Sequence, residues 1–137
     1  MLATDIMIKS AEEFKHLRES EVPEEYRRAA HEEAPIQVWK DIINRFPEMR
    51  VWVAQNKTVP IEILKHLASD KDSNVRCMVA GKRKLNREIK EILIGDSDSS
   101  VRVRLASNAN LEIEYLQILS NDPETFVRET ALMKLGK

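Results

Sequence analysis

The chain has 137 residues, of which 42% are hydrophobic and 33% charged, and its formal net charge is −1. This composition is typical of a soluble globular protein that buries its own core, and it argues against a disordered chain. The single cysteine, Cys77, excludes an intrachain disulfide and a cysteine-rich zinc or iron–sulfur site. The opening MLATDIMIKS is too short and too polar for a signal peptide, and no apolar run approaches a membrane span, so we expect a cytoplasmic protein without a membrane segment.

The first third of the chain predicts a polar cap. Residues 1–48 carry a net charge of −4, whereas residues 49–137 carry one of +3. The motif SAEEF, which begins at Ser10, matches a capping box at the start of a helix. The glutamates within residues 12–33 give this region the polar outer surface that a terminal repeat needs. Trp39 and the isoleucines around it are expected in the core.

From Met49 onwards the chain repeats itself with a period of 26 residues. The rows are 49–74, 75–100, 101–126 and a partial row at 127–137. The columns that recur hold Arg50, Arg76, Arg102 and Arg128; Ala54, Ala80 and Ala106; Leu67, Leu93 and Leu119; and Asp70, Asp96 and Asp122. A degenerate earlier row aligns with these if Ala30 is matched with Ala54. The chain is therefore a repeat protein.

Each row divides into two short helices. The first helix contains a Val-Arg or Met-Arg pair and is expected to end near Asn56, Arg83 or Asn108. Its free amides are expected to be capped by Asn74, Ser100 or Thr125. The second helix is expected to begin near Pro60, Asn86 or Leu111. One such pair has too little apolar surface to fold alone, so we predict a stack of about five pairs in a single all-α domain over residues 1–137, with about ten helices and no strand.

At this point the rows resemble two known repeat families. An acidic turn before a Val-Arg is similar to the HEAT repeat, as is the segment VRETALMKLGK. The segments VRVRLASNANLEIEYLQIL and NKTVPIEIL are equally similar to the bacterial leucine-rich repeat variant. The resemblance covers residues 30–137 and implies an armadillo-like, right-handed α-solenoid. The repeat variant occurs alongside a cysteine-ligated iron–sulfur cluster, which Cys77 alone cannot hold, and its shorter row leaves open whether the second helix is α or 3₁₀.

The arginine column has two interpretations. It is either a basic ladder for phosphates or an acidic partner, or a structural ladder in which each arginine pairs with aspartates of its own and the neighbouring turn. Because an aspartate column recurs in phase with it, we favour the structural ladder. Its members are Arg50, Arg76, Arg102, Arg128, Asp70, Asp96 and Asp122.

A second column varies from row to row and is the candidate partner-binding strip. It holds Trp52, Met78, Arg104 and Thr130. The resemblance to HEAT proteins implies that this helix lines the concave face, where variable side chains recognise a partner. The alternative is that Trp52 and Met78 pack between neighbouring helices.

A basic cluster in the row 75–100 borders this strip. It consists of Lys82, Arg83, Lys84, Arg87 and Lys90, and the other rows do not share it. It is either a binding patch, of which Lys82 and Arg83 are the candidate contacts, or an ordinary solvated surface.

No catalytic arrangement is visible. His16, His31 and His66 share no helical face, the glycines are isolated, and Cys77 is expected to be a buried, inert thiol. We therefore expect a protein that is not an enzyme, with no cofactor and no metal site.

The leading functional hypothesis is a monomeric module that binds another protein on its concave face. A more specific version is a bacterial immunity or antitoxin-type protein whose acidic cap screens a basic toxin. The competing hypothesis is a HEAT-like nucleic-acid-binding protein related to the alkylpurine DNA glycosylases, which the net charge of −1 disfavours because such proteins need many phosphate contacts.

Overall fold

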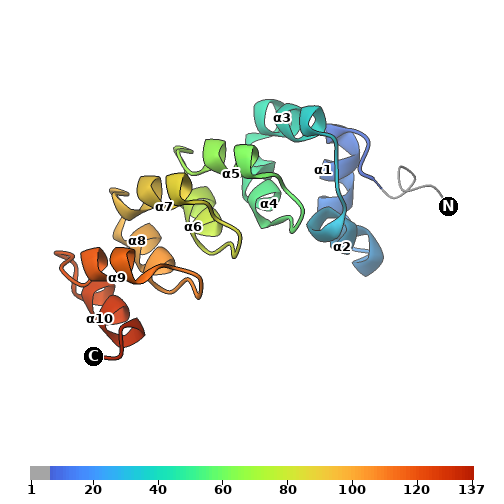
Figure 1. The fold of residues 1–137 in the computed structure, drawn as a ribbon. Coiled ribbons are helices and arrows are strands. Elements are labelled where there is room, and N and C mark those ends of the chain that lie inside the picture. The colour runs from blue at the N-terminus through green and yellow to red at the C-terminus, as the bar shows by residue number, and fades with distance from the viewer. Residues whose placement is uncertain (1–6) are drawn as a thin grey trace. The chain divides into compact units, whose positions relative to one another are not determined.

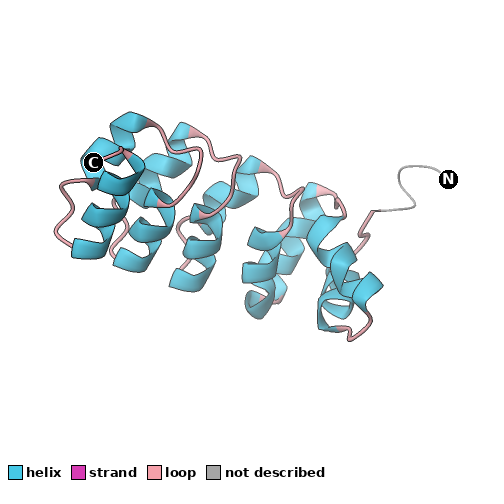
Figure 2. Ribbon diagram, turned by 90° about the horizontal axis from the view of Figure 1, so that it is seen from below, coloured by secondary structure: helices cyan, strands magenta, loops and turns pink. Residues whose placement is uncertain are grey.

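The computed structural model describes residues 7–137 (Figure 1). Within that range the chain forms ten α-helices, a turn of 3₁₀ helix and no strand, so the predicted all-α class is confirmed (Figure 2). The chain divides into two compact units, Met1–Leu64 and Lys65–Lys137, and the division falls inside the row 49–74. No helix of the described residues is long and apolar enough to cross a membrane.

The helices of each unit follow the predicted rows closely. Unit 1 contains α1 (Ala11–Glu19), α2 (Pro23–His31), α3 (Ile36–Arg45), the 3₁₀ turn η2 (Pro47–Met49) and α4 (Arg50–Gln55). The helix α5 (Ile61–Leu67) contains the division. Unit 2 contains α6 (Ser73–Ala80), α7 (Arg87–Ile94), α8 (Ser99–Ala106), α9 (Ile113–Leu119) and α10 (Thr125–Lys134). The second helix of every row is α-helical, which resolves the question that the sequence left open.

Unit 1 is organised around an aromatic pair. The helix α1 begins at Ser10, whose hydroxyl accepts a hydrogen bond from the backbone N–H of Glu13, as the capping box predicts. It carries Phe14 against Trp39 of α3, with ring centroids 5.6 Å apart and the rings edge to face. Both side chains are almost fully buried, which confirms Trp39 as a core residue. Large buried aromatic rings therefore hold α1 to α3.

The degenerate row in unit 1 is shifted by one residue from the alignment made on the sequence. Ala29 is buried, whereas Ala30, which was matched with Ala54, is half-exposed. The carbonyl of Ala29 accepts a hydrogen bond from the side chain of Asn56, and the carbonyl of Ala80 accepts the corresponding bond from Asn108. Ala29 therefore has the structural role that the alignment gave to Ala30.

Unit 2 consists of two rows of helices. The helices α6, α8 and α10 lie side by side in one row, and α7 and α9 form the other (Figure 1). The buried side chains between the rows recur with the sequence period, as Val79, Leu105 and Ala131 do. Ala80 and Ala106 are also fully buried, because alanine at this position lets neighbouring helices of the first row approach closely.

The helices of the first row in unit 2 are capped by residues that the sequence interpretation passed over. Asp72 accepts a hydrogen bond from the backbone N–H of Asn74, and Asp98 accepts one from Ser100. The predicted caps, Asn74 and Ser100, thus supply the amides and not the capping oxygens. The reason is that the acidic turn places an aspartate at the N-cap position, where its carboxylate also faces the positive end of the helix.

Candidate interaction surface

The arginine and aspartate columns of unit 2 meet in two bidentate ion pairs. Arg76 donates through Nε and Nη2 to the carboxylate of Asp96, at 2.8 and 3.2 Å. Arg102 donates in the same way to Asp122, at 2.8 and 3.1 Å. The two aspartate side chains are only 6% and 7% exposed, so these pairs are shielded from water. Parallel bonds of this kind fix orientation as well as distance.

Each of these arginines also holds its own turn. Nη1 of Arg76 donates to the backbone carbonyl of Asp70, and Nη1 of Arg102 donates to that of Asp96. The sequence interpretation had each arginine pair with aspartates of both turns. In the structure the carboxylate comes from the following turn and the own turn contributes a carbonyl, because the arginine side chain has only one edge for each.

The protonation of the ladder follows from these bonds. The hydrogen bonds that Arg102 donates to Asp122 raise the pKa of the guanidinium above its usual value. Burial by itself would raise the pKa of Asp122, but the bonds from Arg102 and from the backbone N–H of Glu124 outweigh it, and the pKa of Asp122 lies below its usual value. Both groups are therefore charged at neutral pH.

The other predicted ladder members have different partners. In unit 1, Nε of Arg50 donates to the carbonyl of Ile43 at 2.9 Å. In unit 2, Arg128 bonds to the backbone of its own turn, and among the described residues no carboxylate lies within ion-pair distance of it.

Buried asparagines hold successive turns together, and the sequence interpretation missed their role. Asn108 donates through Nδ2 to the carbonyls of Ala80 and Lys82, at 2.9 and 2.7 Å. In unit 1, Asn56 donates to the carbonyls of Ala29 and Glu32. Both asparagines are buried. The signal was an asparagine column, but Lys82 interrupts it in the middle row, so it did not stand out.

The predicted basic cluster is largely engaged inside unit 2. Lys90 is buried, and its Nζ forms an ion pair with Glu112. Nη1 of Arg87 lies 2.8 Å from a carboxylate oxygen of Glu114, and its guanidinium lies over the ring of Tyr115. These two basic residues therefore belong to the packing of α7 against the loop before α9 and against α9 itself, and they leave the cluster as a binding patch.

Three arginine and lysine side chains near the ends of α6 and α8 remain without a carboxylate. Among the described residues, no acidic side chain forms an ion pair with Arg83, Lys84 or Arg104, all of which are exposed. The guanidinium of Arg104 lies against Gly81, where a Cβ atom would meet its Nε at 2.6 Å. Gly81 therefore gives Arg104 a flat backbone surface on which to lie, beside the half-buried Lys82.

The remaining strip residues fall in both units. Met78 is half-buried on α6 and Arg104 is exposed on α8, both in unit 2, whereas Trp52 is half-buried on α4 in unit 1. The guanidinium carbon of Arg18 lies 3.6 Å from the centroid of the Trp52 ring. One face of the indole is therefore covered by a cation–π contact within unit 1. A single strip through all three residues stays a prediction.

The thiol of Cys77 is half-buried and not buried, so that expectation was wrong. Its sulfur lies 3.6 Å from the hydroxyl of Ser100 on α8. The reason is its position on the helix: it faces the neighbouring helix of the same row and not the core between the rows. Together with the contact between Arg104 and Gly81, it defines the register of α8 against α6.

The same register identifies an apolar element that the sequence interpretation missed. Phe126, Thr130 and Met133 follow one another at i, i+4 and i+7 and therefore share one face of α10. They occupy the columns of Ser100, Arg104 and Ser107 on α8. Phe126 is 72% exposed and Met133 75% exposed. We call Met78, Gly81, Arg104, Phe126, Thr130 and Met133 the α6–α8–α10 surface.

Phe126 and Met133 stand in columns that are polar or glycine in the neighbouring helices, where Asn74, Gly81, Ser100 and Ser107 lie. This change of residue type was visible in the rows. It was passed over because only the column of Trp52 was read for variation.

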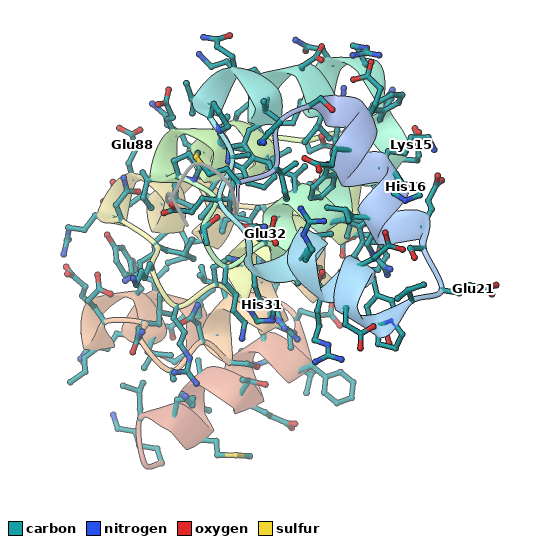
Figure 3. The ribbon with its side chains drawn as sticks, turned by 90° about the vertical axis from the view of Figure 1, so that its right-hand side faces the viewer. Lys15, His16, Glu21, His31, Glu32 and Glu88 are labelled. Atoms are coloured by element: carbon teal, nitrogen blue, oxygen red, sulfur yellow. The ribbon has the colours of Figure 1, made fainter. Side chains whose placement is uncertain are left out.

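The acidic side chains of unit 1 are mostly paired within the unit. Arg45 pairs with Glu12 and Asp41, and Arg28 pairs with Glu32. Further pairs join Arg28 to Glu13, Lys15 to Glu19 and Glu48, and His16 to Glu25. Figure 3 shows that Glu21, by contrast, points away from the turn between α1 and α2. The net charge of the cap is thus spread over internal pairs and presents no continuous acidic surface.

The described residues contain no group of three or more His, Cys, Asp or Glu side chains that could hold a metal ion. His16 forms its pair with Glu25 on the outer side of α1, and His31 lies at the end of α2 (Figure 3). No catalytic pairing of nucleophile and base is therefore present among them.

Comparison of the chain with protein-family models, with curated proteins and with solved structures gave no match. The resemblance to HEAT and leucine-rich repeat variant proteins therefore rests on the repeat pattern alone.

Proposed function

We propose that the chain is a non-enzymatic, protein-binding α-solenoid of the HEAT or leucine-rich repeat variant type. In this proposal the α6–α8–α10 surface is the inner face of a right-handed stack and holds a partner protein. The observation that carries the proposal is the exposure of Phe126 and Met133 beside Arg104 on helices whose equivalent positions are otherwise polar or glycine. Exposed aromatic, thioether and guanidinium groups are those that dominate protein interfaces.

The arginine ladder supports a scaffold role for the rest of unit 2. Its guanidinium groups are bound on both edges by carboxylates and carbonyls of the fold, so they are not available to a ligand. Recognition then depends on the residues that differ between rows, as expected for a regular stack that presents variable side chains.

A toxin-neutralising role is the more specific version of this proposal. It was based on the acidic cap, and the internal pairing of Glu12, Glu13 and Glu32 weakens that argument. The exposed residues of unit 2 that lack a carboxylate are basic, which favours a partner that presents acidic groups to this unit.

The nucleic-acid alternative has less support. It requires a continuous basic face that neutralises many phosphates. Arg76, Arg87, Lys90 and Arg102 are each paired with a carboxylate of the chain, so only a few basic side chains of unit 2 remain for phosphates.

The experiment that tests the proposal compares surface variants in affinity capture from a bacterial lysate, followed by mass spectrometry. We expect the wild-type chain to retain a protein that Arg104→Ala and Phe126→Ala each lose, because each removes about 1–3 kcal/mol of binding free energy. The matched control is Lys65→Ala, which changes an exposed lysine of unit 2 that is paired with Glu88 and lies off the surface. A partner retained equally by all four proteins would refute the surface, and nucleic acid recovered in place of protein would favour the alternative.

A further inference from the structure

Arg128 occupies the third position of the arginine ladder in unit 2. Its Nη1 donates to the carbonyl of Asp122 at 3.0 Å, six residues before it in the chain. Arg76 and Arg102 make the same bond to the carbonyls of Asp70 and Asp96, also six residues before them. This shared bond, together with a further one to the carbonyl of Pro123, orients the guanidinium of Arg128.

The other edge of Arg128 is open. In Arg76 and Arg102 this edge, formed by Nε and Nη2, holds a carboxylate with two parallel bonds. In Arg128, Nη2 donates instead to the hydroxyl of Thr125 at 3.2 Å, which is a long and neutral bond. Among the described residues no carboxylate lies within ion-pair distance of it. The fold thus positions a guanidinium for a carboxylate and leaves the second bonding edge unused.

The helix that carries this edge also differs from its neighbours. Leu132 stands half-exposed in the column of the fully buried Ala80 and Ala106. The carbonyl of Leu132 accepts a hydrogen bond from the backbone N–H of Lys137. Gly136 adopts a positive φ of 80° in the same turn, as in a helix end that closes on itself. In the preceding row the corresponding carbonyl, that of Ala80, is bound by the side chain of Asn108.

We infer that Arg128 is a binding site for an aspartate or glutamate carboxylate of another protein. The carboxylate takes the place that Asp96 and Asp122 take on the two preceding arginines, with Nε and Nη2 donating to its two oxygens. Apolar side chains of the same segment then cover Leu132 and the exposed thioether of Met133. The occupant is thus an acidic segment of a partner that also carries an apolar side chain, and the charge of Arg128 is the reason for that choice.

The site is separate from the α6–α8–α10 surface proposed above, except for Met133, which lies between them. It therefore stands or falls on different variants, since neither Arg104 nor Phe126 takes part in it.

The experiment selects binders from a library of random peptides on the immobilised full chain. The affinity of the enriched peptides is then measured by fluorescence anisotropy. We expect enriched peptides to contain an aspartate or glutamate next to apolar residues, and Arg128→Gln to weaken their binding about tenfold or more. Arg128→Lys is expected to lose nearly as much, because a lysine cannot donate two parallel bonds to one carboxylate. Arg83→Gln is the matched control, since it removes the same charge from an exposed arginine of unit 2 that lies off the site.

A second measurement does not depend on the folding of any variant. Replacing the acidic residue of the peptide by its amide should weaken binding to the wild-type chain by a similar factor. The inference is refuted if no acidic peptide is enriched, or if the amide peptide and Arg128→Lys bind as well as their parents. An equal loss with Arg83→Gln would show general charge attraction and no site, and self-association of the chain that Arg128→Gln abolishes would make a second copy the occupant.

Discussion

Units 1 and 2 hold short helices together by different means. Unit 1 relies on large side chains: Phe14 against Trp39 in the core, and Arg18 over the ring of Trp52. Unit 2 relies on polar groups that recur with the sequence period, the pairs Arg76–Asp96 and Arg102–Asp122. A bulky aromatic contact is specific to one place, whereas a bidentate ion pair is compact enough to be repeated in every row. The regular part of the chain is therefore the part whose contacts can be copied.

The largest effect is expected in the aromatic core of unit 1. Trp39→Ala should lower the free energy of unfolding of unit 1 by about 3–5 kcal/mol, because it leaves a large cavity beside Phe14. Chemical denaturation followed by far-ultraviolet circular dichroism measures this change. Loss of less than about 1 kcal/mol would mean that unit 1 is not organised by its aromatic pair.

Breaking the ladder in unit 2 should have a smaller effect. Arg102→Ala is expected to cost about 1–3 kcal/mol of stability, because it leaves the buried carboxylate of Asp122 and the carbonyl of Asp96 without their donor. Both tryptophans, Trp39 and Trp52, lie in unit 1, so their fluorescence reports that unit alone. The variant should therefore shift the circular dichroism transition more than the fluorescence transition, and an equal shift of both would argue against a local role.

The ladder also predicts a dependence on pH. The pKa of Asp122 is lower in the folded chain than its ordinary value, so the stability that it contributes is complete above that ordinary value and is lost as the pH falls through the folded pKa. We expect unit 2 to lose stability below about pH 4. The check is the denaturation midpoint of wild type and Asp122→Asn across this range. The amide variant should be less stable at neutral pH and should show the weaker acid dependence.

The smallest effect concerns the cation–π contact of unit 1. Arg18→Ala should cost about 0.5–2 kcal/mol, the range for a guanidinium over an indole. It should also shift the tryptophan emission to longer wavelength, because water replaces the guanidinium over Trp52. Lys40→Ala, an exposed change on α3 in the same unit, is the control. Unchanged emission would place Trp52 in an environment that Arg18 does not shape.

The repeat of 26 residues determined much of unit 2 before any coordinate was seen. It predicted two short helices in each row, the apolar columns of Val79 and Leu105, and the recurrence of arginine with aspartate. It could do so because a stack buries the same positions in every repeat, so that burial appears in the sequence as periodicity. The capping box at Ser10 was equally visible, since its bonds are local.

Other features depend on which residues meet across turns, and those only the tertiary structure decided. The sequence placed Lys90 and Arg87 in an exposed cluster, but Glu112 and Glu114 of the next row reach them. It likewise gave no sign that Arg18 covers Trp52, because 34 positions separate the two residues and no period links them. Charge and hydrophobicity are properties of a residue, whereas pairing and exposure are properties of its neighbours in space, and for these residues the neighbours are supplied only by the folded chain.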